Sequence, residues 1–352
     1  MQSLSISKMM VVSIAVVVFL MPTQTNAQWW NPSDPMPEKQ RNPEAANPFT
    51  YTRESLNAAS MVIQMSLEAG NWGKLETMHN DFLKRKSRAT DGTWMVESFQ
   101  WGFDAWFASR DMERCDRLFR DWKDKMPESR LRPLAEAAMW QRQAWSARGG
   151  RFASTVPGES QQIFRERLKL AQTALDNNPD GAVYSPIWHW VALIVAGSTG
   201  QPKAEFEKLF DQAVAKFPAY QSLYFTRANY LLPQWGGNFK ALDNFIRASA
   251  AATAATEGAA LYAWLYVDAS RKLDADLFSA TQISWPTMKQ SFEDMTARFP
   301  DAWNKNLFAT FACRARDRET TKKLLNELGP KAQLGIWSSG VSTESCRRLV
   351  GD

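Results

Sequence analysis

The chain has 352 residues, of which 45% are hydrophobic and 22% are charged, a composition that excludes a wholly disordered protein. Lys and Arg number 42 against 37 Asp and Glu, an excess too small to indicate a nucleic-acid partner. The chain has 16 Trp but only 2 His, which leaves few residues for zinc binding or histidine-based catalysis. We therefore predict no cofactor and no bound metal.

The N-terminus has the features of a secretory signal peptide. Lys8 precedes an apolar run over residues 9–21, and Thr25 and Ala27 supply small residues at the −3 and −1 positions of a cleavage site. The run is shorter than the ~20 residues that span a bilayer. We predict cleavage after Ala27 and a mature protein that is periplasmic or secreted, with no stable membrane span. An uncleaved membrane anchor is the alternative.

The segment after the predicted cleavage site is rich in proline. Residues 28–50 contain five prolines and no apolar period, which predicts an extended linker. Within it, Trp29 and Trp30 either dock on the domain that follows, the interpretation we favour, or bind a partner. We predict a helical-repeat domain over residues 51–330 and a C-terminal tail over residues 331–352.

Apolar residues recur with a helical period from about Arg53 to Leu328. Residues 206–217 carry apolar side chains at positions i, i+4, i+7 and i+11, and residues 164–175 and 288–299 repeat the pattern. Each stretch predicts a helix with one buried face. Alternating β-branched residues are nearly absent, so strands are not expected. The predicted fold class is all-α.

Three of these helices share one pattern at their ends. Pro127, Pro218 and Pro300 each directly follow an apolar residue, with another apolar residue five positions earlier and a Phe eight positions earlier. They lie 91 and 82 residues apart, about twice a repeat unit of ~40–45 residues. Proline suits such positions because it cannot continue the helix that precedes it.

Glycine marks the other turns. Gly70, Gly149 and Gly237 each precede a new apolar stripe, and glycine readily adopts the left-handed conformation that ends a helix. Together the prolines and glycines predict about seven helical hairpins. Stacked hairpins of this length form an α–α superhelix, or α-solenoid, in which an aromatic ring fills the space between neighbouring pairs.

One unit resembles the tetratricopeptide superfamily. The matching residues are Trp190, Leu193, Phe210, Ala213 and Pro218, at that family's spacing. The match is partial, because Phe206 stands where the family has a small residue and the other units are longer. The resemblance implies a tetratricopeptide-like solenoid.

Two further stretches resemble an uncharacterised bacterial family of helical-repeat proteins known as a domain of unknown function. The first stretch runs from Trp145 through Gly149 and Val156 to Leu168, and the second covers residues 230–237. The resemblance extends over roughly residues 55–325. It implies the fold and almost nothing about activity.

The second stretch contains the candidate recognition loop Trp235, Gly236 and Gly237. Trp235 follows a proline and precedes two glycines, so its ring is expected at a turn. One interpretation is a loop that binds a partner. The other, which we favour, is a helix terminator whose indole plugs the next unit.

No catalytic residue is assigned. His189 lies between two Trp residues and is expected to be a buried imidazole, and His79 is expected at the rim of an apolar stripe. Neither has a Cys or a second His at metal-ligand spacing. Glu159 begins a helix, where the helix dipole favours an acid. Nucleophile-elbow and phosphate-loop motifs are absent from the sequence.

These observations favour a non-catalytic, exported helical-repeat protein that binds a protein or peptide partner along its curved surface. The alternative is an all-helical hydrolase or lyase acting on envelope polysaccharide, with Trp residues that stack on sugars and a Glu/Asp pair for acid–base chemistry. A purely structural envelope component is a third possibility. The sequence leaves open the identity of the partner, the oligomeric state and any enzymatic activity.

The three cysteines give a testable expectation. Cys115 lies on an apolar helical face and is expected to be a buried thiol, whereas Cys313 and Cys346 either pair or remain free. A disulfide between them would stabilise the fold by roughly 3–4 kcal/mol in the chain-entropy model. Mass spectrometry of the alkylated, denatured protein should then count one thiol before reduction and three after it. Three thiols without reductant would contradict the pairing.

Overall fold

The computed structural model describes residues 50–108, 110–150, 155–273, 277–334 and 341–351. The predicted signal peptide, the linker up to residue 49 and the pair Trp29 and Trp30 lie outside the described residues.

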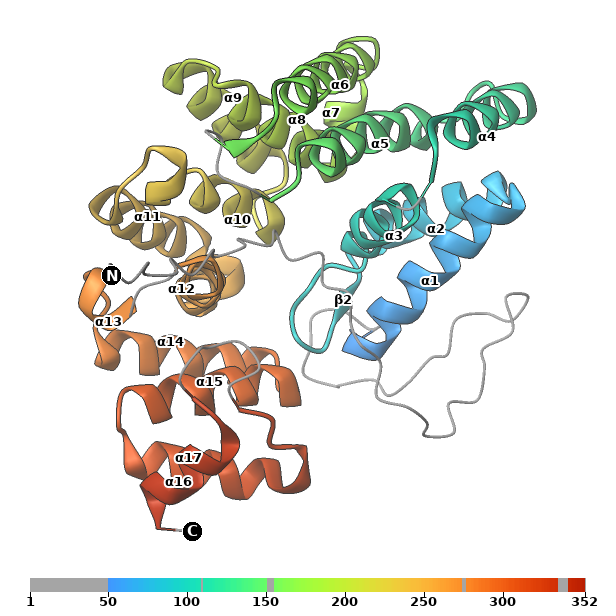
Figure 1. Ribbon diagram of the computed structural model, residues 1–352. Helices are drawn as coiled ribbons and strands as arrows, with labels where there is room; N and C mark the ends of the chain where they lie inside the picture. Colours follow the sequence, from blue (N-terminus) through green and yellow to red (C-terminus); the bar gives the residue numbers. More distant parts are fainter. Residues whose placement is uncertain (1–49, 109, 151–154, 274–276, 335–340, 352) are drawn as a thin grey trace, which may run out of the picture.

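The described chain is almost entirely helical (Figure 1). The first eight α-helices are α1 (Arg53–Ala69), α2 (Trp72–Arg85), α3 (Glu97–Ala108), α4 (Met112–Lys125), α5 (Leu131–Arg148), α6 (Gly158–Asp176), α7 (Gly181–Tyr184) and α8 (Pro186–Thr199). The remaining nine are α9 (Lys203–Lys216), α10 (Gln221–Asn229), α11 (Phe239–Glu257), α12 (Ala260–Lys272), α13 (Leu277–Ala280), α14 (Trp285–Arg298), α15 (Ala302–Arg314), α16 (Arg318–Leu328) and α17 (Thr343–Val350). The described residues also include the 3₁₀ turns η2 (Pro233–Trp235) and η3 (Gly329–Lys331). The all-α prediction is confirmed, and α17 lies beyond the range in which helices were expected.

The three proline-terminated helices end with the same backbone geometry. In α4, α9 and α14 the residue before the proline leaves the helix with φ between −141° and −128° and ψ between 66° and 76°. Its amide donates to the carbonyl four residues earlier in all three cases. The Phe residues eight positions before the prolines, Phe119, Phe210 and Phe292, are all buried. The local sequence pattern therefore encodes a repeated local structure.

The longer helices follow one another along a curved path. Helices α1, α3, α5, α8, α10 and α12 contact each other in succession, and α12, α14, α15 and α16 continue the series. In Figure 1 the chain runs from α1–α4 on the right, over α5–α9 at the top, to α11–α17 on the left and below. Neighbouring helices approach closely at Gly102, where a Cβ atom would lie 2.7 Å from Ile63 of α1.

The expectation that strands are absent was wrong at one point. Strands β1 (Thr50–Tyr51) and β2 (Arg88–Ala89) pair in parallel, with Thr50 opposite Arg88 and Tyr51 opposite Ala89. Two residues on each strand can pair through their backbone N–H and C=O groups alone. Such a short strand needs no alternation of β-branched side chains, so the sequence pattern does not predict it. The pairing joins the entrance of α1 to the segment between α2 and α3.

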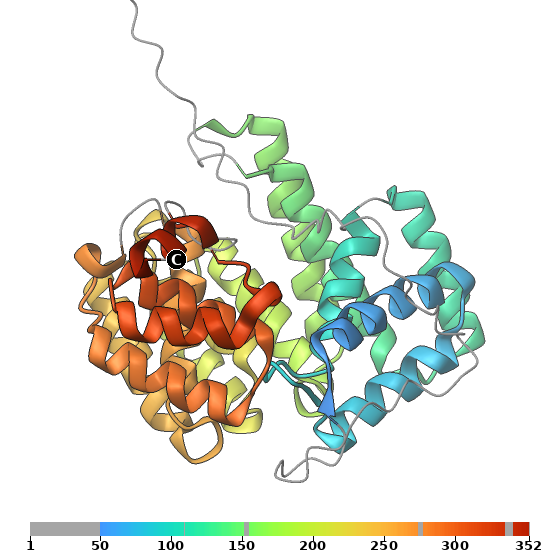
Figure 2. The same cartoon turned by 90° about the horizontal axis from the view of Figure 1, so that it is seen from below.

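We name residues 87–96 the bridging loop. They link α2 to α3 in sequence and make hydrogen bonds with the C-terminal helices. Arg88 forms two hydrogen bonds with the Glu257 carboxylate of α11, at 2.8 and 2.7 Å, and Glu257 is 1% exposed. The Trp94 indole donates to the Ala219 carbonyl at 2.8 Å, and the Asn304 amide donates to the Asp91 carbonyl at 3.1 Å. Figure 2 shows β2 lying between the first helices and the C-terminal helices.

Gly92 is needed at the tip of this loop for two reasons. Its φ of +91° lies in the left-handed region, which residues with a Cβ atom rarely adopt. A Cβ atom there would also lie 2.9 Å from the Trp264 ring and 3.0 Å from the Phe299 ring. The loop backbone therefore packs directly against aromatic side chains of the C-terminal helices.

Tryptophan is mainly a packing residue in this fold. All thirteen tryptophans among the described residues are buried or half-buried. The Trp72 and Trp122 rings stack with their centroids 4.6 Å apart, joining α2 to α4. Trp122 is fully buried, and Trp190 and Trp285 are half-buried against the core.

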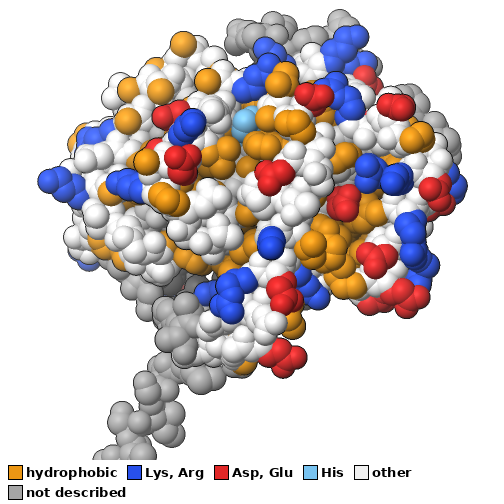
Figure 3. All heavy atoms as spheres, turned by 90° about the horizontal axis from the view of Figure 1, so that it is seen from above, with side chains coloured by type: hydrophobic (Ala, Val, Ile, Leu, Met, Phe, Trp, Pro, Cys, Tyr) orange, Lys and Arg blue, Asp and Glu red, His pale blue; other side chains and the backbone are white. Residues whose placement is uncertain are grey.

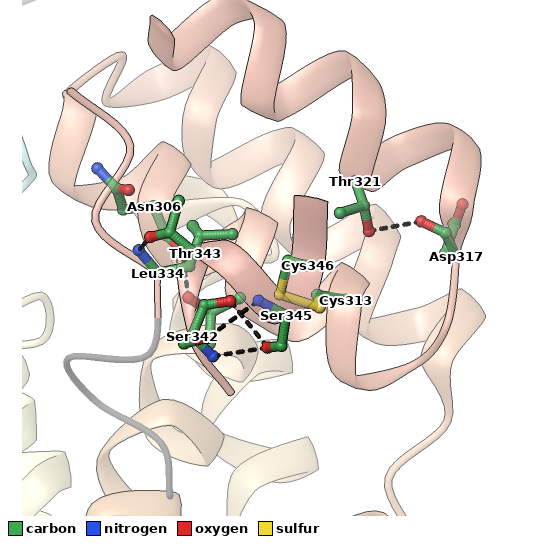
Figure 4. Close-up of a disulfide and its surroundings, with 10 residues drawn as sticks. Asn306, Cys313, Asp317, Thr321, Leu334, Ser342, Thr343, Ser345 and Cys346 are labelled. Carbon is green, nitrogen blue, oxygen red and sulfur yellow. Dashed lines mark hydrogen bonds between the residues drawn. A yellow bond between two sulfur atoms is a disulfide. The ribbon is translucent and has the colours of Figure 1, made fainter. Parts of the chain in front are cut away.

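The C-terminal segment is attached to the helices that precede it. Cys313 of α15 and Cys346 of α17 form a disulfide with their Cα atoms 5.7 Å apart (Figure 4). The Leu334 amide donates to the Thr343 hydroxyl, and Ser342 and Ser345 form a capping box at the start of α17. Cys115 is fully buried, and burial raises the pKa of its thiol to about 11.

None of the helices that the structure describes has both the length and the apolar character needed to span a membrane.

The ion pair of the bridging loop gives a stability prediction. Arg88→Met leaves the buried Glu257 carboxylate without its main partner, so the free energy of unfolding should fall by roughly 3–5 kcal/mol. The measurement is chemical denaturation followed by circular dichroism.

The matched control is Arg348→Met, which removes a solvent-exposed ion pair with Glu344 and should cost about 0.5 kcal/mol or less. Equal effects of the two substitutions would show that the bridging loop does not hold the structure together.

Candidate functional site

One face of α3 carries polar and aromatic side chains that reach solvent. Glu97, Trp101 and Asp104 occupy positions i, i+4 and i+7, which lie on the same side of a helix, and all three are half-buried. The opposite side carries Phe99, Phe103 and Phe107, which are buried, so the core fixes the rotation of α3. The polar face is therefore held in one orientation.

Glu97 is the first residue of this face and of α3. Its carboxyl group is hydrogen-bonded to the indole of Trp101 and to the hydroxyl of Ser222 in α10. Burial raises the pKa of Glu97 to about 7, and the nearby carboxylate of Asp91 acts in the same direction. The two hydrogen bonds and the charge of Arg53 lower the pKa but do not outweigh burial. A carboxyl that titrates near neutral pH can accept or donate a proton there.

Arg53 and Asp91 form the charged edge of the site. The Arg53 guanidinium is paired with the Asp91 carboxylate and lies 3.6 Å from the centroid of the Trp303 ring. It also lies 5.7 Å from the centroid of the Trp101 ring. Asp91 belongs to the bridging loop and Trp303 to α15, so Arg53 of α1 contacts residues that lie far apart in the sequence. We name Arg53, Asp91, Glu97, Trp101, Ser222 and Trp303 the Glu97 site.

Asp104 extends the same face by two turns of α3. Burial raises the pKa of its carboxyl to about 6, although the charge of Arg142 in α5 acts in the opposite direction. The charge of Arg142 therefore does not compensate for the burial of Asp104.

The Glu97 site combines apolar and polar groups. Two indoles provide apolar area and cation–π capacity, and Glu97 and Ser222 provide hydrogen-bonding groups. The described residues contain no cluster of three or more His, Cys, Asp and Glu side chains that could hold a metal ion.

A second constellation brings a serine and a histidine together. His79 lies 3.0 Å from the Ser185 hydroxyl through Nε2 and 3.0 Å from the Tyr184 hydroxyl through Nδ1. Ser185 caps α8 and, like His79, is completely buried. Burial, and secondarily Arg130, lowers the pKa of His79 to about 3. No substrate can reach this pair, so it joins α2 to α8 and is not a catalytic dyad.

The placement of His79 corrects a prediction. It was expected at the rim of an apolar stripe, but it is fully enclosed. Tyr184 and Ser185, which follow more than a hundred residues later, cover it, and nothing near His79 in sequence indicates that cover.

His189 is buried, as expected for an apolar helix. Its Nε2 donates to the Ala182 carbonyl at 2.9 Å, and its Nδ1 has no hydrogen-bond partner among the described residues. Burial lowers the pKa of this imidazole. The neutral form with the proton on Nε2 fits these contacts.

The candidate recognition loop takes the form of a 3₁₀ turn that ends at Gly236, with φ +81°. Trp235 is half-buried, with its ring edge-on to Trp145 at 5.8 Å and to Tyr230 at 5.6 Å between centroids. A Cβ atom on Gly237 would overlap the Leu231 carbonyl. The two stretches that resemble the helical-repeat family thus meet in one aromatic cluster, and Trp235 packs against it.

Glu159 lies exposed in the first turn of α6. On the face drawn in Figure 3, basic and acidic side chains are interspersed with hydrophobic ones. That face carries no continuous patch of a single charge sign.

The sequence interpretation missed the Glu97 site. The spacing of Glu97, Trp101 and Asp104 opposite a Phe-rich face predicts that the three share one side of a helix. The same spacing is found on ordinary solvated helix faces, so it does not identify a ligand site.

No protein-family model matches the chain, and no curated protein or solved structure matches it either.

The state of Glu97 gives a pH prediction. Its pKa is about 7 in the folded chain and 4.5 in the reference state, so the folded protein binds the proton more tightly. The free energy of unfolding should therefore fall by roughly 2–3 kcal/mol as the pH rises from about 4.5 to 8. Glu97→Gln should remove this part of the pH dependence.

The measurement is denaturant unfolding of both proteins across that pH range. His79 acts in the opposite direction below pH 6.5, because its folded pKa is about 3, so only the difference between the two proteins isolates Glu97. Parallel curves for the two proteins would show that Glu97 titrates normally.

Proposed function

We propose that this protein is an exported, non-catalytic helical-repeat protein of tetratricopeptide-like architecture that binds an extended segment of a protein or peptide partner. The observation that carries the proposal is the Glu97 site. There a half-buried carboxyl and two half-buried indoles from α3 and α15 lie close together. Half-buried aromatic side chains beside fixed hydrogen-bonding groups are typical of residues that dominate binding energy.

The arrangement of helices supports a repeat architecture. Fourteen helices of nine or more residues lie between Arg53 and Leu328, as many as seven hairpins require. Helices α4, α9 and α14 end with the same backbone geometry, and they end at the three prolines whose spacing predicts the repeat. In the proposed superhelix, α3 presents its polar face to the partner.

Two features support export. The first 27 residues have the pattern of a signal peptide, and the Cys313–Cys346 disulfide suits an oxidising compartment. The proposed location is the periplasm or the extracellular space.

An all-helical hydrolase or lyase acting on polysaccharide is the second candidate. It is favoured by the raised pKa values of Glu97 and Asp104, which flank Trp101 on one helix face. Seven residues of helix separate their backbones by roughly 10 Å along the axis, and both carboxyls project from the same side. Glycosidases instead place two carboxyls on opposite sides of the scissile bond, so we rank this candidate second.

The test is affinity capture from envelope extracts with residues 28–352 as bait. Trp101→Ala should weaken capture of the partner by at least ~30-fold, as expected for a tryptophan at the centre of an interface. The matched control is Leu170→Ala, which removes an exposed apolar side chain of α6 and should leave capture unchanged. Trp235→Ala tests the candidate recognition loop in the same assay.

Loss of capture with Trp235→Ala but not with Trp101→Ala would move the binding site to that loop. Failure to recover any partner, together with glycan turnover that Glu97→Gln abolishes, would establish the enzyme instead.

A further inference from the structure

The exposed side of α1 carries a line of apolar residues. Ala58, Met61, Met65 and Ala69 occupy positions i, i+3, i+7 and i+11, so they lie along one side of the helix, and all four are exposed. Met61 is 41% exposed and Met65 is 54% exposed. The buried side of α1 packs on α2, α3 and the two short strands. We name these four residues the α1 stripe.

The α1 stripe differs from the rest of the described surface. The exposed large hydrophobic residues of the described chain are Met61, Met65, Leu170 and Val183. Leu170 and Val183 lie on different helices, α6 and α7, and single exposed apolar side chains of this kind are common. The two methionines, in contrast, are neighbours one turn apart on α1. They form an apolar surface that no described element covers, since both remain exposed.

The size of the α1 stripe favours one kind of occupant. Two exposed Met side chains and two Ala offer an area on the scale of one or two indole rings, which bury ~150–250 Å² each. A stable dimer buries about 800 Å² on each partner, so a second copy would need much more surface than the stripe provides. A segment of the same chain needs less, because its tether supplies an effective concentration in the millimolar range.

The chain before Thr50 provides such a segment. In the predicted mature protein it covers residues 28–49 and leads through β1 directly into α1. Trp29 and Trp30 are its largest apolar side chains, and the proposed function does not use them. Methionine sulfur makes favourable contacts with aromatic rings. A pair of indoles therefore matches a pair of methionines in chemistry and in area.

The length of the segment fits the distance to be covered. From Arg53 to Met65, α1 extends roughly 18 Å along its axis. Trp30 precedes Thr50 by 20 positions, and a flexible chain of that length has an r.m.s. end-to-end distance of about 25 Å. Effective concentration is highest when this distance is close to the span. The five prolines of residues 28–50 extend the segment and restrict its free conformations, so docking costs less entropy.

We propose that Trp29 and Trp30 dock on the α1 stripe, with their indoles over the Met61 and Met65 side chains. The N-terminal segment then lies back along α1 and covers the exposed side of the first helix. The inference is independent of the proposed function, because the Glu97 site contains none of these residues.

The test measures the protection of individual methionines. The mature chain, residues 28–352, is treated with hydrogen peroxide at micromolar protein concentration, and sulfoxide formation at each Met is followed by peptide mass spectrometry. The comparison is the Trp29→Ala, Trp30→Ala double variant. An intrinsic Kd of about a tenth of the effective concentration keeps about nine tenths of molecules docked, so Met61 and Met65 should oxidise about tenfold faster in the double variant. Met112 and Met126, which are half-buried, should oxidise at the same rate in both proteins.

A reciprocal variant tests the α1 stripe itself. Met61→Glu places a charge at an exposed position, where it opposes apolar docking without disturbing the core. In this background the two Trp substitutions should no longer change the oxidation rate of Met65. The matched control is Leu170→Glu, which alters a 42% exposed apolar residue of α6 and should preserve the tenfold difference.

Three outcomes would overturn the proposal. Equal oxidation of Met61 and Met65 in the mature chain and the Trp double variant would show that the indoles do not cover them. Protection that survives the Trp substitutions and rises with protein concentration would assign the α1 stripe to a second copy. Protection that appears only after envelope extract is added would assign it to a partner.

Discussion

The buried ion pair between Arg88 and Glu257 is the interaction on which the arrangement of this fold most depends. Its two hydrogen bonds attach the bridging loop to α11, and the Arg88 guanidinium also lies over the rings of Trp94 and Phe299. The loop is followed directly by Glu97, the first residue of α3. Movement of the loop would therefore displace Asp91 and Glu97 together.

The same loop makes this protein different from a simple linear array. In an ideal solenoid each repeat contacts only its neighbours, so sites are built from adjacent repeats. Here Arg53 lies on Trp303, and Asn304 donates to the Asp91 carbonyl, across more than two hundred residues of sequence. The Glu97 site thus joins the first helix to α15, and its geometry depends on the whole curvature of the chain.

Burial governs the protonation of the interior in both directions. It raises the pKa of Glu97 and Asp104 and lowers that of His79, because in each case the charged form loses hydration. His79 is sealed and remains neutral around pH 7, so it serves only as a hydrogen-bonding link. Glu97 is half-buried and its pKa is about 7, so the charge of this carboxyl changes with pH near neutrality.

The sequence by itself determined the features that short stretches encode. Helix ends at Pro127, Pro218 and Pro300, the all-helical class and the burial of Cys115 follow from the period of apolar residues and from backbone chemistry within a few turns. Only the tertiary structure decided that Arg53, Glu97 and Trp303 meet and that His79 is sealed. These contacts depend on the accumulated rotation of many successive helices and on one loop that crosses between distant parts of the chain, and no local pattern records either.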